Sequence, residues 1–311
     1  MEDKFSLNKN KCLFLWLNNK EFHAVEAAKR GIEVAQVYKQ LPTAMRAIRR
    51  VQIELNIPWT SPWIASWKKK ITHYETVIIH ASKITPPVVK FIRRKNPDVR
   101  IIVWYWNPVD KCVGLDQFSD VDCEIWSFDE EDCARYGLKY NTQYYFNNVS
   151  LKTTQDKFDV FFVGGDKGRI KDLVDIKQKF DNLGISSYFH ITPTGRKHEV
   201  YKEIYKERIS YTKVLDYISE SKAILDYLSE KQSGLTLRPL EALFFRKKLI
   251  TNDKTIVNRD FYRKENIFVL GKDDIENLPQ FLNTPYQNVE EEIVNKYDFD
   301  SWLERFFKEN I

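Results

Sequence analysis

The sequence predicts an α/β protein with two Rossmann-like, doubly wound domains that face each other across a cleft. Short apolar runs of the kind that form buried strands alternate with segments of helical pattern, which is typical of a mostly parallel sheet. This alternation stops in a polar, irregular stretch at 141–157 and then begins again. A chain of 311 residues is long enough for two domains of ordinary size, each with its own core.

The first half contains five predicted strands, four of them apolar runs and one with a β-branched, extended pattern. Continuous apolar runs are expected where helices cover both faces of a sheet. The strands are Lys11–Leu17, Ile32–Val37, Thr76–Ala81, Arg100–Trp106 and Glu124–Phe128, and the helices between them are Glu21–Arg30, Thr43–Leu55, Pro86–Lys95 and Asp129–Tyr136. Gly31 follows the first helix in the usual C′ position, and two prolines begin the third helix.

The second half repeats the pattern after the polar stretch, so we place the linker between the domains there. Its predicted strands are Phe158–Val163, Ser186–Ile191, Ala223–Leu228, Lys248–Thr251 and Asn266–Leu270, and its helices are Arg169–Leu183, Ser210–Ser219, Arg238–Phe245, Asp274–Leu282 and an amphipathic tail over Phe299–Lys308. Ligands of open α/β sheets bind at the carboxyl ends of the strands, which favours a site in the cleft.

A glycine-rich loop follows the first strand of the second half. Gly164, Gly165 and Gly168 let the backbone approach a phosphate closely, and the next helix offers N–H donors at its start. Lys167 and Arg169 add positive charge that suits a diphosphate. The pattern is neither a GxGxxG fingerprint nor a P-loop, and an ordinary βα turn with exposed charges is the alternative.

A second loop opens a helix at Gln232–Leu243. Gly234 and the backbone N–H groups from Leu235 onwards can face a pyrophosphate. Glu241 lies one turn inside the helix, where a carboxylate can accept both hydroxyls of a ribose, and Arg238 is placed to balance it and to reach phosphate. The alternative is that Glu241 only complements the helix dipole.

The stretch Gln232–Asp253 (QSGLTLRPLEALFFRKKLITND) resembles the donor-binding segment of GT-B glycosyltransferases, and the loop Val163–Arg169 looks like the first glycine loop of the same lobe. Ile209–Leu228 also fits, with a helix that carries Tyr211 before the strand AILDYL. The likeness covers Lys157–Leu270 and is greatest to bacterial enzymes of capsule and lipopolysaccharide synthesis.

The resemblance implies roles for individual residues. Glu241 would hold the donor ribose, while Gly165, Lys167, Arg169, Thr236 and Arg238 would approach the diphosphate. Residues 1–150 would form the acceptor-side domain and 151–295 the donor domain, with the C-terminal helix 296–311 packing back on the first. Many retaining members carry two glutamates eight positions apart. Ser233 occupies the earlier position here, so the stereochemistry stays open.

The remaining chemistry of the sequence offers few competing sites. The four cysteines form no CxxC pair, and we predict neither a cofactor nor a metal site. Asp120 and Asp122 spell the DxD motif of another transferase fold, but they lie in an acidic stretch that favours solvated carboxylates. For the catalytic base we name His23, after the first strand, and Asp110, after the third; the alternative for each is an ordinary residue with no catalytic role.

Charge is spread unevenly along the chain. From Met1 to Asp110 there are 19 Lys and Arg against 9 Asp and Glu, or +10, while the whole chain carries +5. Such a basic third suits anionic lipid, an anionic substrate or nucleic acid, or is simply a solvated face. The polar N-terminus does not resemble a signal peptide, and no apolar stretch is long enough to span a bilayer, so we expect a cytoplasmic protein, with possible association with the inner membrane surface.

Together these features predict a glycosyltransferase that moves a sugar from a nucleotide-sugar donor to a glycan or lipid-linked glycan acceptor in bacterial surface polysaccharide synthesis. A nucleotide-sugar epimerase on the same fold is one alternative. A basic nucleic-acid-binding protein is another, but the basic residues avoid the glycine loops and no binding motif is recognised, so we expect no nucleic-acid partner.

Overall fold

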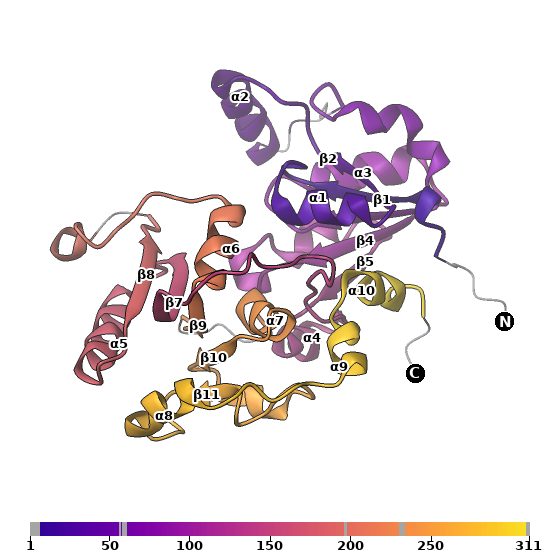
Figure 1. Cartoon of the computed structure of the whole chain (residues 1–311). Helices are drawn as coiled ribbons and strands as arrows, with labels where there is room; N and C mark the ends of the chain where they lie inside the picture. The colour runs from indigo at the N-terminus through magenta and orange to yellow at the C-terminus, as the bar shows by residue number, and fades with distance from the viewer. Residues whose placement is uncertain (1–6, 56, 58–60, 196–197, 230–233, 309–311) are drawn as a thin grey trace. The chain divides into compact units, whose positions relative to one another are not determined.

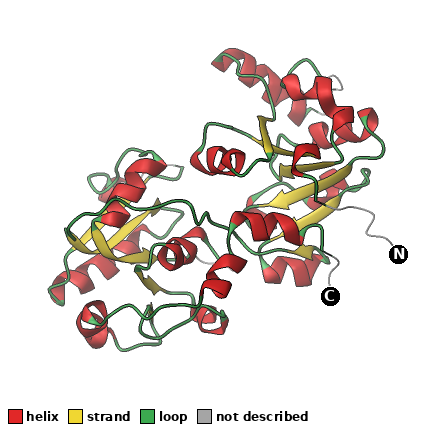
Figure 2. Cartoon of the chain, turned by 45° about the vertical axis from the view of Figure 1, so that its right-hand side comes forward, coloured by secondary structure: helices red, strands yellow, loops and turns green. Residues whose placement is uncertain are grey.

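The computed structural model describes residues 7–55, 57, 61–195, 198–229 and 234–308 of the chain (Figure 1). The chain divides into two compact units. Unit 1 contains the described residues up to Gln143 and those from Trp302 onwards, and unit 2 runs from Tyr144 to Ser301. Each unit is built on a parallel sheet flanked by helices, which confirms the α/β class with two Rossmann-like domains (Figure 2).

The sheet of unit 1 has the strand order β2-β1-β3-β4-β5-β6, and every pairing in it is parallel. The strands are β1 (Cys12–Trp16), β2 (Glu33–Gln36), β3 (Thr76–His80), β4 (Arg100–Tyr105), β5 (Glu124–Ser127) and β6 (Lys139–Tyr140). The edge strand β6 is not among the predicted strands, because its two residues are exposed and show no apolar run.

The helices of this unit are α1 (Phe22–Lys29), α2 (Thr43–Glu54), α3 (Pro86–Lys95) and α4 (Glu130–Tyr136). All five residues of β1 are buried, as its continuous apolar sequence requires of a strand covered on both faces. The carboxylate of Asp129 accepts hydrogen bonds from the N–H groups of Glu131 (3.0 Å) and Asp132 (3.2 Å), so it caps α4 as predicted.

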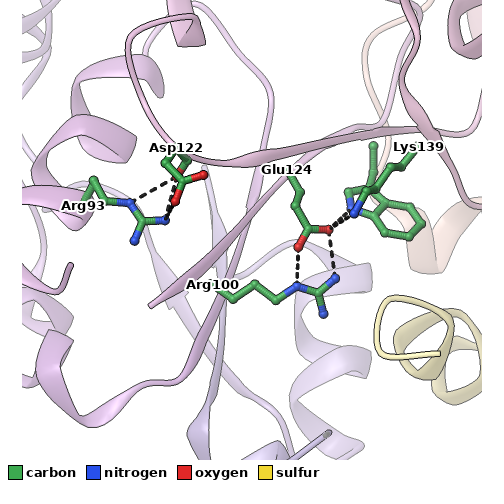
Figure 3. Close-up of polar contacts among 6 residues, drawn as sticks. Arg93, Arg100, Asp122, Glu124 and Lys139 are labelled. Atoms are coloured by element: carbon green, nitrogen blue, oxygen red, sulfur yellow. Dashed lines mark hydrogen bonds and ion pairs between the residues drawn. The ribbon is translucent and has the colours of Figure 1, made fainter. Parts of the chain in front are cut away.

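An ion-pair network ties the last strands of unit 1 together (Figure 3). The Arg100 guanidinium on β4 donates to both oxygens of Glu124 on β5, at 2.5 and 2.9 Å. Lys139 on β6 donates to the same carboxylate at 2.9 Å. Partial burial by itself would raise the pKa of Glu124, but these donors and their charges outweigh it and lower the pKa to about 2.

The end of the chain contributes to the core of unit 1. Trp302, in α10 (Phe299–Arg305), is fully buried, and its ring lies 5.7 Å from that of Phe14 and 5.5 Å from that of Trp104. Arg305 donates from Nε to the side-chain oxygen of Asn141 at 2.7 Å. These contacts bury apolar rings from β1, β4 and α10 against one another.

The sheet of unit 2 has the strand order β11-β10-β9-β7-β8, again with every pairing parallel. Its strands are β7 (Phe158–Gly165), β8 (Ser187–Thr192), β9 (Ser221–Asp226), β10 (Lys248–Thr251) and β11 (Ile267–Val269). Its helices are α5 (Ile170–Asn182), α6 (Tyr211–Ser219), α7 (Leu237–Phe244), α8 (Leu278–Asn283) and α9 (Glu291–Lys296). Tyr144, Tyr145 and Phe146, from the stretch expected as the linker, are fully buried here.

Three elements of unit 2 differ from the predictions in ways that matter here. Strand β7 continues through Gly164 and Gly165, because these glycines pair with Ile191 and Thr192 of β8. Strand β9 ends at Asp226, two residues earlier than predicted. Helix α9 was not predicted at all, and none of its residues is buried, so it lacks the apolar face that reveals a helix in a sequence.

Candidate functional site

The strand order of unit 2 marks the place where a ligand is expected. The chain passes from β7 to β8 on one side, and β9 then pairs with the other side of β7. Ligands of doubly wound sheets bind outside the carboxyl ends of the strands at such a reversal. Gly165 ends β7 and Asp226 ends β9, so both predicted loops leave the sheet at or near this point.

The loop after β7 is organised by the buried carboxylate of Asp166. Its Oδ1 accepts hydrogen bonds from the N–H groups of Gly168 (3.0 Å) and Ile170 (3.2 Å), and Tyr205 donates its hydroxyl to Oδ2 at 2.5 Å. Two N–H groups at the start of α5 thus already have a protein partner. Lys167 is exposed at the tip of the turn with a positive φ of 48°, followed by Gly168 at 82°.

The glycines at the end of β7 allow close packing rather than an unusual backbone conformation. A Cβ atom on Gly165 would lie 2.7 Å from Oγ1 of Thr194, and one on Gly164 would lie 3.0 Å from a guanidinium nitrogen of Arg169. Arg169 donates to the carbonyl of Gly165 at 3.2 Å, and its guanidinium lies 5.3 Å from the ring centre of Phe162. Burial lowers the pKa of Arg169, which still leaves it charged at neutral pH.

The second loop is tied back to Asp226, the last residue of β9. Thr236, directly before α7, donates its hydroxyl to Oδ1 of Asp226 at 3.1 Å. Gly234 has the positive φ of 80° that favours glycine, whereas the Leu235 side chain is buried in the core, so only its backbone could meet a ligand. Gln232 and Ser233 lie outside the described residues.

Glu241 is fully buried on α7, and both of its oxygens are engaged. Tyr211 on α6 donates its hydroxyl to Oε1 at 2.6 Å, and Arg238 forms an ion pair with Oε2. The hydroxyl of Tyr145 lies 2.7 Å from that of Tyr211 and extends the chain of hydrogen bonds. Burial raises the pKa of the Glu241 carboxyl, while Arg238 and Tyr211 oppose the rise.

The cations from the two loops act on one carboxyl group. Burial raises the pKa of Asp226 to about 6, against the lowering effects of the Thr236 hydrogen bond and of the positive charges on Arg169 and Arg238. The charges of Arg169 and Arg238, which are far apart in the sequence, thus act on the same buried carboxyl group. We call Arg169, Asp226, Arg238 and Glu241 the switch-point cluster.

Sequence reasoning did not single out three residues that shape this site: Tyr145, Asp166 and Asp226. Asp226 had a signal that could have found it, because it is a lone acidic residue at the end of an otherwise apolar strand. Asp166 sits directly after the glycine pair, where an N-capping side chain is common. Nothing in the sequence linked Tyr145 to Tyr211.

The two candidate bases of unit 1 lie against different partners. His23, near the start of α1, has its ring 5.6 Å from that of Trp106, and the ring of His80 lies 5.5 Å from the same indole. Burial, followed by the charge of His23, lowers the pKa of His80 to about 3. Asp110 is exposed in a short 3-10 turn and accepts a long 3.5 Å hydrogen bond from Tyr136 on α4.

The DxD carboxylates form ion pairs. Asp120 lies 2.8 Å from the Lys90 ammonium, and Asp122 lies 3.5 Å from the Arg93 guanidinium, a pair visible in Figure 3. Within the described part of the chain, no group of three or more His, Cys, Asp or Glu side chains is placed to hold a metal ion. Nor does that part contain a helix with the length and apolarity needed to span a membrane.

Solved structures of glycosyltransferases share this architecture. The sucrose-phosphate synthase of Thermosynechococcus elongatus matches with a TM-score of 0.58 at 8% identity, over 95% of this chain and 96% of that one. HepE of Anabaena, solved with UDP and glucose, matches with a TM-score of 0.55 at 11% identity, over 95% of this chain and 98% of that one. The lipopolysaccharide outer core galactosyltransferase WaaB matches with a TM-score of 0.51 at 16% identity, over 95% of this chain and 97% of that one.

The chain has the GT-B fold. No family model and no curated protein matches it in sequence. At identities of 8–16% the likeness concerns the fold alone, so what the switch-point cluster binds has to be argued from its own chemistry.

Proposed function

We propose that this protein is a glycosyltransferase that takes a sugar from a nucleoside-diphosphate donor bound at the carboxyl edge of β7 and β9. The observation that carries the proposal is that both arginines of the switch-point cluster lie at the strand reversal. Arg169 donates to the carbonyl of Gly165, which ends β7, and Arg238 pairs with Glu241 on α7, the helix that follows β9. Two guanidinium groups suit a diphosphate because each can donate several hydrogen bonds to its oxygens. Exposed Lys167 adds a third cation at the loop tip.

In this proposal the cations stabilise the departing nucleoside diphosphate. Negative charge grows on the diphosphate as the bond to the sugar breaks, and fixed positive groups nearby lower the energy of that state. Lys167, Arg169 and Arg238 supply this charge, so we propose a reaction that needs no metal ion. Addition of a chelator should then leave the transfer rate unchanged.

Arg238 also determines when Glu241 becomes available. Both oxygens of Glu241 have protein partners, so a ribose can bind them only if one partner leaves. The Arg238 side chain is one-fifth exposed, whereas Glu241 is fully buried. We propose that the donor diphosphate attracts the Arg238 guanidinium away from Oε2, and that the ribose hydroxyls then take its place on the carboxylate.

The acceptor side of the proposal is assigned to unit 1. WaaB is named for lipopolysaccharide outer core synthesis, and we propose that the present chain likewise extends a glycan or lipid-linked glycan of the bacterial surface, at the cytoplasmic face of the membrane. His23 and Asp110 are the candidate bases that would deprotonate the acceptor hydroxyl. A His23→Ala variant that keeps full activity would leave Asp110 as the candidate.

The test is a thermal-shift panel of UDP, GDP, dTDP, CMP and their sugars. A ligand that binds only the native state raises the melting temperature, so one nucleotide and its sugar should stabilise the wild type. Arg238→Gln and Glu241→Gln should both reduce that shift strongly. Glu290→Gln is the matched control, because it removes another carboxylate of unit 2 that is exposed and paired with Arg263.

The variants separate binding from folding. If Glu241→Gln lowers the melting temperature without ligand, the ligand-induced shift is still compared within that variant. Equal shifts in wild type, Arg238→Gln and Glu241→Gln would remove the switch-point cluster from donor binding. A protein that responds to no nucleotide in the panel would contradict the proposed function as a whole.

A further inference from the structure

We propose that α2 is a membrane-docking helix, which lies in the surface of an anionic lipid bilayer with one apolar face inserted. The proposal concerns unit 1 and does not depend on the switch-point cluster of unit 2. It begins from an uneven distribution of exposed apolar side chains. Of nine large hydrophobic residues exposed in the described part of the chain, five fall between residues 45 and 57.

Four of these side chains form a single ridge on one side of the helix. Met45, Ile48, Val51 and Leu55 follow one another at intervals of three, three and four residues, which places them on one helical face. Their exposed fractions are 38%, 54%, 52% and 65%. We call these four residues the apolar ridge.

A different face attaches α2 to unit 1. Ile53 is the buried residue of the helix, and the Arg49 guanidinium lies 4.3 Å from the ring centre of Tyr38. Beside the ridge itself, Trp63 donates to Gln52 at 2.7 Å. Figure 1 shows α2 at the margin of its unit, away from the sheet. A helix of 12 residues gains little stability from its backbone alone, so α2 depends on this packed face, while the ridge stays exposed.

The charge around the ridge identifies that partner. Between residues 39 and 74 there are seven Lys or Arg and one acidic residue, Glu54, a local excess of +6. Lys39, Lys68 and Lys69 line one surface hollow, and Lys39 also lines a second hollow with Arg46 and Arg49 of α2. Burial, and then the charges of Lys39 and Lys69, lower the pKa of Lys68.

An aliphatic ridge with arginines on the opposite side of the helix is the pattern of a helix that lies in the bilayer interface. The apolar side chains enter the acyl boundary, and the basic ones meet lipid phosphates. A protein partner is the other possible occupant of the ridge, and the experiment below separates it from the bilayer. The apolar ridge together with the local positive charge favours an anionic bilayer as the binding partner.

The experiment is flotation of the full chain with vesicles. Wild type should float with vesicles of equal parts phosphatidylglycerol and phosphatidylcholine, and less well with phosphatidylcholine alone or at high salt. Ile48→Ser/Val51→Ser/Leu55→Ser should lower partition into the mixed vesicles by about tenfold or more. Arg46→Gln/Arg50→Gln should lower it roughly tenfold on mixed vesicles and leave binding to neutral ones unchanged.

Val200→Ser is the matched control, since it removes an apolar side chain that is 88% exposed in unit 2. It should float like wild type. Melting temperatures within a few degrees of wild type would show that the ridge variant is folded, as its exposed positions lead us to expect. The proposal is overturned if wild type stays in solution with mixed vesicles, if the ridge variant floats equally well, or if sedimentation reveals a dimer that the ridge substitutions dissociate.

Discussion

The Tyr211 hydroxyl donates a 2.6 Å hydrogen bond to Oε1 of Glu241, a carboxylate with no exposed surface. This bond joins α6 to α7 at the point where Arg238 neutralises the other oxygen. A buried carboxylate is tolerated only when its oxygens are paired, so Tyr211 and Arg238 together keep Glu241 stable in the interior.

Tyr211→Phe is therefore expected to destabilise unit 2. The substitution removes the donor to Oε1 and leaves a buried acceptor unsatisfied, which costs about 1–3 kcal/mol in the free energy of unfolding. Urea unfolding measures this cost. Tyr188→Phe is the control, because its hydroxyl donates only a 3.3 Å bond to the Tyr217 hydroxyl, and it should cost less than about 1 kcal/mol. Equal losses in both variants would contradict the special role of Tyr211.

Asp226 should make stability depend on pH. Its pKa is raised to about 6 in the folded protein, against an ordinary value near 3.8, so the fold favours the protonated carboxyl. The stability that this contributes is present below the ordinary value and is lost as the pH rises through about 6. Wild type should therefore lose stability relative to Asp226→Asn between pH 4 and pH 7, by on the order of 3 kcal/mol. Urea unfolding of both proteins at several pH values measures this loss. A difference in the free energy of unfolding that stays constant with pH would contradict the prediction.

Gly165→Ala should introduce a steric conflict. The new Cβ would lie 2.7 Å from Oγ1 of Thr194, so either the loop or the end of β7 must shift, at a cost of about 1–3 kcal/mol. Thr194→Ala removes the conflicting oxygen, and the double variant should recover part of the loss. A double-mutant cycle on the free energy of unfolding measures this coupling. Simple additivity of the two changes would show that the conflict lies elsewhere.

Trp302→Ala should weaken unit 1, although the residue comes near the end of the chain. Its fully buried indole packs on Phe14 and Trp104, and its removal leaves a cavity that costs about 3–5 kcal/mol. Hydrogen exchange should become faster in β1 and β4. Val25→Ala, on the exposed side of α1, should leave exchange unchanged. Unaltered protection of β4 in Trp302→Ala would show that the tail does not support this sheet.

Much of the fold could be predicted because its central strands are continuous apolar runs. Strands β1, β3 and β4 lie within one residue of their predicted ends, and β10 matches at both ends. Exposed elements such as β6 and α9 were missed, since they bury no apolar pattern that a sequence could reveal. Gly164 and Gly165 were expected in a loop, but pairing with β8 outweighed their weak strand preference.

By itself, the sequence determined two parallel α/β units, the glycine loop after β7, and the positions of Arg169, Arg238 and Glu241 near the ends of two loops. Only the tertiary structure decided that Asp166 accepts hydrogen bonds from the N–H groups of Gly168 and Ile170, that Tyr211 and Arg238 hold Glu241 from both sides, and that the charges of Arg169 and Arg238 both act on Asp226. The physical reason is the range of the interactions. Apolar periodicity is a pattern among neighbouring residues, so the sequence shows it directly. Burial depends on segments that only folding brings together, and so do the ion pairs and pKa shifts that follow from burial.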